Sequence, residues 1–351
     1  MRIIASRRLY EYFTKLCTCA VVCFCLMITA SFAASVIPFK GIVTANAEPG
    51  IGEESKETSY REEKSAESSE MSEETSATFP EESACAETSE EVPRFANEIP
   101  EVNLSQYGLG DVPVMKVIDQ TDYSPDIAEY ESASIKTGGI VSDKPTVLIY
   151  HTHGTERYAS LSTYPDGYEF NSTDTSENVV AVGDCLAECL EELGIGVIHD
   201  RTMYDADGYT TSYSRSKKAV KELLAAYPSI EYVIDIHRDS VESDGKQAKT
   251  VTLFDENCAQ VMIVVGTDAG GSSHKGWKDN FACAVRLQET MNSLYPTFAR
   301  PIYLRTASFN QELSAGSLLI EVGACGNTLE EAKKAASLLA TSLKNAFDTD
   351  K

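Results

Sequence analysis

From Lys144 onward, short apolar runs alternate with longer segments of helical periodicity. The runs are rich in β-branched residues, a pattern typical of strands that are buried on both faces. Because helices separate these strands, we expect an α/β fold with a mostly parallel sheet flanked by helices, in a single domain over residues 102–351. The stretch Gly108–Gly139 shows neither a strand-like nor a helix-like pattern of apolar residues and is predicted to be an irregular segment that leads into the domain. The predicted strands are Val147–Tyr150, Val197–Ile198, Tyr232–Ile236, Thr250–Phe254, Val261–Val265, Ile302–Leu304 and Leu318–Val322.

Four segments between these strands carry apolar residues at spacings of three and four. In the segment Glu177–Leu193, for example, Val179, Val182 and Leu186 fall on one stripe of a helix. Gly194 follows directly, and glycine is the usual residue just past a helix C-terminus. The other predicted helices are Ser212–Ala226, Lys278–Leu294 and Leu329–Asn345.

The N-terminal region contains an uncharged apolar run of 24 residues, Leu16–Phe39. At ~1.5 Å per residue, a helix of this length crosses the ~30 Å hydrocarbon core of a bilayer. Basic residues precede the run and predict that this end stays in the cytoplasm while the rest is exported. We therefore expect a single-pass membrane anchor within residues 1–44 and an extracytoplasmic domain. A cleaved signal peptide is the alternative, because Ser31–Ala33 resembles a processing site.

The segment 45–101 differs sharply from the rest in composition. Between Glu48 and Glu101 there are 17 Glu against four basic residues, a net charge of −13, and large apolar residues are scarce. Such a segment buries too little apolar surface to offset its loss of conformational entropy. It is predicted to be a disordered linker, extended by charge repulsion, that holds the domain away from the membrane.

Net charge and residue counts exclude several classes of function. The chain of 351 residues has a formal net charge of −24 and shows no basic stretch interleaved with aromatic residues, so nucleic acid is not an expected partner. The ten Cys residues form no pair of Cys-x-x-Cys units, which argues against a structural zinc ribbon. Cys185 and Cys189 lie one helical turn apart, a spacing compatible with packed thiols and with a disulfide. The five histidines are His151, His153, His199, His237 and His274.

Residues of the metal-binding types follow three of the predicted strands. His151 and His153 come directly after the first strand, His237 ends the third, and Glu321 lies in the last. The carboxyl ends of parallel strands meet at one edge of a sheet, where α/β proteins place their sites. Two imidazoles, a carboxylate and an open position for water form the ligand set of a catalytic zinc ion. There the metal activates the water, and a second carboxylate accepts its proton.

Each of these residues also has a simpler explanation. His237 alone fits a buried histidine with hydrogen-bond partners. Glu177 alone fits a helix N-terminus, where the helix dipole favours an acidic side chain. Glu321 is harder to explain, because burying a carboxylate after an apolar run is costly unless it is paired or functional. Their joint occurrence at strand ends favours a site.

Four sequence blocks together closely resemble one family. They are Thr146–Tyr158 (TVLIYHTHGTERY), Tyr232–Ser240 (YVIDIHRDS), Val261–Thr267 with Trp277, and Leu318–Asn327 (LLIEVGACGN). In this order they resemble the stage II sporulation protein P family, membrane-anchored cell-wall hydrolases of endospore formers. The similarity covers residues from about 139 to 346, and the predicted anchor and linker also resemble that family's layout.

The family is in turn similar to zinc-dependent N-acetylmuramoyl-L-alanine amidases, which implies an amidase-like fold and Zn²⁺ as cofactor. His153 matches the amidase Gly-His-Gly turn, Glu177 the glutamate at a helix start, and His237 the Ile-His strand end. Glu321 matches the glutamate of the Leu-x-Glu-x-Gly strand. The resemblance thus implies the zinc ligands His153, Glu177 and His237, with Glu321 as the catalytic general base.

The match departs from the amidase pattern in its second element. Asn178 follows Glu177 directly here, whereas the amidases place one or more residues between them. Asp174 or a water is therefore an alternative to Glu177. His151 has no counterpart in the amidase turn, and we expect His151 and Arg238 either to support the ligands or to contact the substrate.

The resemblance implies cleavage of the amide between N-acetylmuramic acid and the L-alanine of the peptidoglycan stem peptide. An additional peptide cross-link endopeptidase activity is attributed to the family. The implied partners are the membrane and two other sporulation proteins. These are sporulation protein D, which is a lytic transglycosylase, and sporulation protein M, which is a membrane protein. They would act together during septal thinning and engulfment.

Two other functions compete with this hypothesis. A non-catalytic wall-binding scaffold of the same fold would bind sacculi without releasing products. An amidohydrolase barrel with both His151 and His153 on metal would need further His or Lys ligands at later strand ends, and the sequence offers few.

Overall fold

The computed structural model describes residues 97–104, 116–131, 133–140, 143–161, 163–165 and 167–348. The predicted anchor Leu16–Phe39 and most of the predicted acidic linker lie outside these residues. In the part of the chain that is described, no helix is both long and apolar enough to cross a bilayer.

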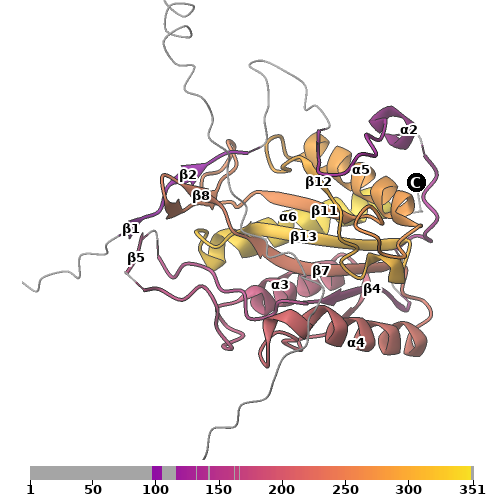
Figure 1. Cartoon of the computed structure of the whole chain (residues 1–351), viewed down its shortest axis with the longest axis horizontal. Helices are drawn as coiled ribbons and strands as arrows, with labels where there is room; N and C mark the ends of the chain where they lie inside the picture. The colour runs from indigo at the N-terminus through magenta and orange to yellow at the C-terminus, as the bar shows by residue number, and fades with distance from the viewer. Residues whose placement is uncertain are drawn as a thin grey trace, which may run out of the picture. The chain divides into compact units, whose positions relative to one another are not determined.

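A seven-stranded sheet forms the centre of the domain (Figure 1). All neighbouring strands run parallel except β11 and β13, so the predicted mostly parallel sheet is confirmed. In spatial order its strands are β3 (Val117–Asp119), β12 (Ile302–Arg305), β11 (Val261–Gly266), β13 (Gly316–Ala324), β7 (Tyr232–Asp239), β4 (Pro145–Tyr150) and β6 (Gly196–His199).

Helices cover both faces of this sheet. The helices α3 (Val179–Glu192), α5 (Trp277–Leu294) and α6 (Leu329–Phe347) pack over the main apolar core, as predicted. The helix α4 (Ser212–Ala226) covers part of the other face, where Val220 packs with Leu148 and Val233. The remaining elements are short: β1 (Asn97–Glu98), β2 (Glu101–Val102), α2 (Ile127–Glu131), β5 (Thr163–Tyr164), η1 (Tyr209–Thr211), β8 (Glu242–Ser243), β9 (Lys246–Gln247), β10 (Lys249–Thr250) and η2 (Gln311–Leu313).

Two predictions about strands were wrong. Only the first residue of the predicted strand Thr250–Phe254 lies in a strand, β10, because the hydroxyl of Thr252 closes a turn with the backbone of Asp255. The predicted irregular lead-in contains β3, which pairs with β12 and adds an edge strand to the sheet.

The start of α3 also differs from its prediction. The side chain of Asn178 accepts a hydrogen bond from the backbone of Val180 at 3.0 Å, so Asn178 is the N-cap. Glu177 therefore precedes the helix instead of opening it. The predicted end is close to the observed one, and Gly194 adopts a positive φ of 80° just beyond it.

The register of the central strands determines which residues meet at the edge of the sheet. Tyr150 of β4 lies opposite Asp235 of β7, so the chain after β4 continues beside Ile236 and His237. On the other side of β7, Glu321 of β13 lies opposite His237. The strand ends with polar residues are therefore neighbours, as the sequence predicts.

Candidate active site

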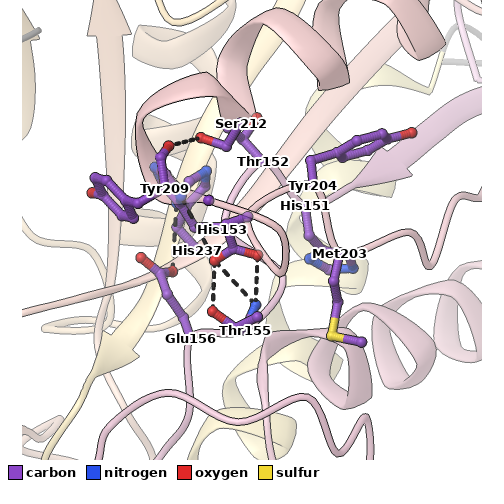
Figure 2. A network of polar contacts seen from close by, with 12 residues as sticks. His151, Thr152, His153, Thr155, Glu156, Met203, Tyr204, Tyr209, Ser212 and His237 are labelled. Atoms are coloured by element: carbon purple, nitrogen blue, oxygen red, sulfur yellow. Dashed lines mark hydrogen bonds and ion pairs between the residues drawn. The ribbon is translucent and has the colours of Figure 1, made fainter. Parts of the chain in front are cut away.

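His153 and His237 lie against each other at the carboxyl edge of the sheet (Figure 2). Their rings meet edge to face with centroids 5.4 Å apart, and both side chains are buried. The Nδ1 atom of His153 has no hydrogen-bond partner. Two of the three predicted metal ligands are thus brought together, each with a buried ring nitrogen that makes no hydrogen bond.

Asp235 joins the turn that carries His153 to strand β7. Its carboxylate accepts hydrogen bonds from the backbone N–H of Thr152 at 2.8 Å and from the Thr152 hydroxyl at 2.6 Å. Its Oδ1 also lies 3.0 Å from Nε2 of His237, although the N–H direction misses the oxygen, so this contact is ionic. Burial alone would raise the pKa of Asp235, but His237 and the Thr152 donors hold it below its usual value.

Glu156 lies on the other ring nitrogen of His237. Its Oε2 is 3.4 Å from His237 Nδ1 and accepts the backbone N–H of Arg238 at 2.9 Å. Burial opposes ionisation of Glu156, yet His237 and Arg238 lower its pKa. The pKa of His237 is in turn raised, because Asp235 and Glu156 outweigh the effect of burial. Glu156 was not predicted, although it belongs to the same sequence block as His153.

Asp205 occupies the corresponding place beside His153. Its Oδ2 lies 3.7 Å from His153 Nδ1, and it accepts hydrogen bonds from the hydroxyl of Thr155 at 2.6 Å and the Thr155 backbone at 3.1 Å. Asp205 is buried and comes from the loop after β6, about fifty residues beyond the His153 turn. No sequence pattern marked it.

Glu321 is a buried carboxylate next to this group, where the sequence places the general base. Its Oε2 has no hydrogen-bond partner. Burial, followed by the negative charge of Asp239, raises the pKa of Glu321 to about 8. Asp239 is itself held by Arg300, whose Nη2 lies 2.7 Å from the Asp239 carboxylate. An unpaired carboxyl that titrates near neutrality is suited to proton transfer.

Glu177 is not brought to the two histidines. Its carboxylate pairs with Arg157 at 2.8 Å and accepts the hydroxyl of Ser172 at 2.6 Å. It is about a third exposed and lines a pocket of about 220 Å³ with Tyr158 and Tyr168. The physical reason is its position before the Asn178 cap, which turns it towards the loop that Arg157 occupies. The alternative ligand Asp174 bonds to Ser176 at the surface instead.

His151 and Arg238 both contact backbone rather than open space. The fully buried His151 directs Nδ1 to the carbonyl of Ile236 at 3.0 Å. Arg238 donates to the carbonyls of Arg157 at 2.9 Å and Phe170 at 2.6 Å. We expected these residues either to support the ligands or to contact the substrate. Their contacts with the backbone agree with the supporting role.

Tyr209 is a further residue that the sequence did not single out. Its ring stacks on His153 with centroids 4.1 Å apart and planes 6° apart. It follows Gly208, whose φ of 140° is a conformation that side chains rarely adopt. Since Tyr209 is 55% exposed, it forms the solvent-facing cover of His153.

The donor atoms around the two histidines are of the types that zinc binds and lie in two separate pairs. Zinc holds its nitrogen and oxygen ligands at about 2.0–2.1 Å, so two ligands of a tetrahedral ion lie roughly 3.3 Å apart. The His237–Glu156 and His153–Asp205 separations, 3.4 and 3.7 Å, are close to that spacing. Across the described ranges, no three His, Cys, Asp or Glu side chains are already gathered around one point, so binding would require the two pairs to close together.

The fold and site define an α/β protein with a buried histidine–carboxylate cluster at the carboxyl edge of a mostly parallel sheet. The family profile of Stage II sporulation protein P (SpoIIP) matches residues 31–344. This chain belongs to that family.

One characterised relative is similar over most of the chain. It is the Stage II sporulation protein P of Bacillus subtilis, 30% identical over 279 residues, which are 71% of this chain and 66% of the relative. The chain thus spans slightly less than two thirds of the relative's length.

Two solved structures resemble the fold. The N-acetylmuramoyl-L-alanine amidase AmiC2 of Nostoc punctiforme is 13% identical, with a TM-score of 0.36 and coverage of 58% of this chain and 97% of that one. The N-acetylmuramyl-L-alanine amidase Ami1 of Mycobacterium smegmatis is 13% identical, with a TM-score of 0.37 and coverage of 60% and 99%. At these scores the likeness carries no weight on activity.

Proposed function

We propose that this protein is a zinc-dependent peptidoglycan hydrolase that cleaves the N-acetylmuramoyl-L-alanine amide. The observation that carries the proposal is the pair of buried histidines, each with a ring nitrogen beside a carboxylate, next to the unpaired carboxyl of Glu321. Membership of the sporulation protein P family supports the cell wall as the substrate.

The residues that would hold zinc are His153 and His237 through their Nδ1 atoms, with Glu156 or Asp205 supplying the carboxylate. This assignment moves the role expected for Glu177 to residues whose contacts with the histidines are observed. When bound, the metal would lower the pKa of a water towards neutrality and polarise the scissile carbonyl. Asp235, on the far nitrogen of His237, would orient the ring, as carboxylates do for most metal-binding histidines.

Glu321 is the group that would move the proton. Burial and the negative charge of Asp239 raise its pKa in the metal-free chain, and a nearby cation would favour the ionised form that accepts a proton. It would accept a proton from the attacking water and give it to the leaving amine. The Asp239–Arg300 pair beside it fixes the charge that this carboxyl experiences.

The site of action follows from the sequence and the family. We propose that Leu16–Phe39 anchors the chain in the membrane and that the domain acts outside it, during septal thinning and engulfment. Cleavage of peptide cross-links and cooperation with sporulation proteins D and M belong to the same proposal.

Digestion of purified sacculi tests this function. The purified chain, with and without a chelator, is incubated with sacculi, and the released fragments are identified by mass spectrometry. We expect stem peptides with a free N-terminal L-alanine, and their loss with chelator. Binding to sacculi without any released peptide, with or without metal, would instead establish the scaffold function.

A further inference from the structure

Behind the His153 turn, a chain of polar side chains leads from the surface to the backbone of β7. The Nε2 atoms of His151 and His199 lie 2.8 Å apart, and the other ring nitrogen of His151 is 3.0 Å from the carbonyl of Ile236. His199 Nδ1 lies 3.1 Å from Asp184, and the same Asp184 oxygen is 2.9 Å from Arg201 at the surface.

The contacts determine where the ring protons of this chain lie. The Ile236 carbonyl only accepts, so His151 carries a proton on Nδ1. A neutral His151 with its proton on Nδ1 presents a lone pair on Nε2 to the Nε2 atom of His199. His199 must therefore donate from its own Nε2. The link from His199 to Ile236 is thus a directed pair of hydrogen bonds.

Helix α3 is shaped to accommodate this histidine pair. A Cβ atom on Gly183 would lie 2.6 Å from Nε2 of both His151 and His199, closer than any real contact. Glycine inside a helix costs about 0.5–1 kcal/mol relative to alanine. Any side chain at this position would force the two rings apart.

One imidazole therefore holds both segments that carry the proposed ligands. His151 is two residues from His153 in the chain, and the carbonyl it bonds belongs to the residue directly before His237. Asp235 makes the equivalent link through Thr152. The two ligand-bearing segments are thus joined by hydrogen bonds through His151 as well as through Asp235.

We propose that His199, acting through His151, is a positioning residue that sets the spacing of the two zinc-binding histidines. The inference rests on the proposed function. Groups behind metal ligands typically change metal affinity by ~10–100-fold when they are removed. Loss of the His199 donor removes one of the two hydrogen bonds that orient the His151 ring, which weakens the hold of this ring on the Ile236 carbonyl.

The test compares His199→Phe with His274→Phe in the full chain. His274 is also buried and bonded, to Asn280 at 2.9 Å, but lies outside the site. Zinc affinity is measured by competition with a chromophoric chelator, and the midpoint of thermal unfolding is measured on the metal-free chains. We expect His199→Phe to bind zinc about tenfold or more weakly than His274→Phe. His199→Gln, which keeps an N–H donor, should recover most of the affinity.

A second variant covers the case in which His199→Phe does not fold. Gly183→Ala raises helix propensity but separates the two rings, so it should also weaken zinc binding. If the wild type binds zinc and either His199→Phe or Gly183→Ala binds it as tightly as His274→Phe does, the positioning role is overturned and the proposed function stands. A wild-type chain that binds no zinc overturns the proposed function itself.

Discussion

His153 and His237 each place a ring nitrogen beside a buried carboxylate, and these contacts decide what the site can bind. The two carboxylates, Asp205 and Glu156, come from different segments. On the far side of His237, Asp235 supplies a third carboxylate. The pKa values of all three carboxylates are lowered by their hydrogen-bond donors and the histidines, so they are ionised and of the type that a cation prefers.

Exchange of a single carboxylate distinguishes Glu156, beside His237, from Glu177, the ligand that the sequence predicts. We expect Glu156→Gln to weaken zinc binding by at least about tenfold, because it removes the charged oxygen beside His237. Glu177→Gln makes the same chemical change in a side chain that pairs with Arg157, and should leave zinc affinity nearly unchanged. Chelator competition on both variants checks this; the reverse order would restore Glu177 as the ligand.

The raised pKa of Glu321 predicts a pH-dependent stability of the metal-free chain. A carboxyl with a pKa of about 8 when folded and its ordinary pKa of 4.5 when unfolded stabilises the fold fully below the lower value. That contribution is lost as pH rises through the folded pKa. Glu321→Gln has no such titration, so its unfolding temperature relative to the wild type should rise between pH 5 and 8.

Thermal unfolding of chelator-treated proteins across that pH range measures the effect. Ser214→Ala, at an exposed position without a titratable group, is the control and should give an almost constant difference from the wild type. A constant difference for Glu321→Gln as well would mean that the Glu321 carboxyl titrates normally.

At the scale of elements, the N-cap Asn178 fixes the start of α3 and joins it to the preceding loop. Asn178 caps the helix through Val180 and also donates to the carbonyl of Ser172 at 3.0 Å, which joins the helix to the loop before it. We expect Asn178→Ala to lower the free energy of unfolding by about 1–2 kcal/mol. Ser214→Ala, on the exposed side of α4, should change it by less than about 0.5 kcal/mol. Denaturant unfolding of the two variants measures both free energies. Equal values would show that the Asn178 cap does not stabilise the protein.

Local sequence was sufficient to predict elements whose apolar residues recur at a regular helical or strand spacing. The helix Ser212–Ala226 was predicted to the residue, because its apolar positions and its end are both local signals. The strand β3 was missed because its three residues carry no pattern and are stabilised by pairing with β12. The turn after Thr250 was missed because a Thr hydroxyl, rather than a Gly or Pro, closes it.

The same distinction explains the site. His153, His237 and Glu321 could be found because they lie near or just beyond the carboxyl ends of buried strands, and parallel strands bring such ends together. Asp205 and His199 depend on tertiary contacts from another loop and strand, which no spacing in the chain reveals. These contacts emerge only when the fold brings the segments together.

At the scale of the whole molecule, the central strands do the positioning. β7 lies between β4 and β13, so it borders both the His153 turn and Glu321. The predicted anchor and acidic linker would carry this domain outside the membrane, where the proposed peptidoglycan substrate lies. An acidic chain of net charge −24 suits neither nucleic acid nor an anionic surface, which is consistent with tethering by a dedicated anchor.

The central claim is that His153 and His237 share one metal ion. Its most direct test is the zinc content of purified full-length protein, measured for the wild type, His153→Ala, His237→Ala and the control His274→Ala after equilibration with zinc and removal of the excess. We expect one tightly bound zinc ion in the wild type and in His274→Ala, and its loss in both other variants. Zinc retained in full by His153→Ala or His237→Ala would contradict it.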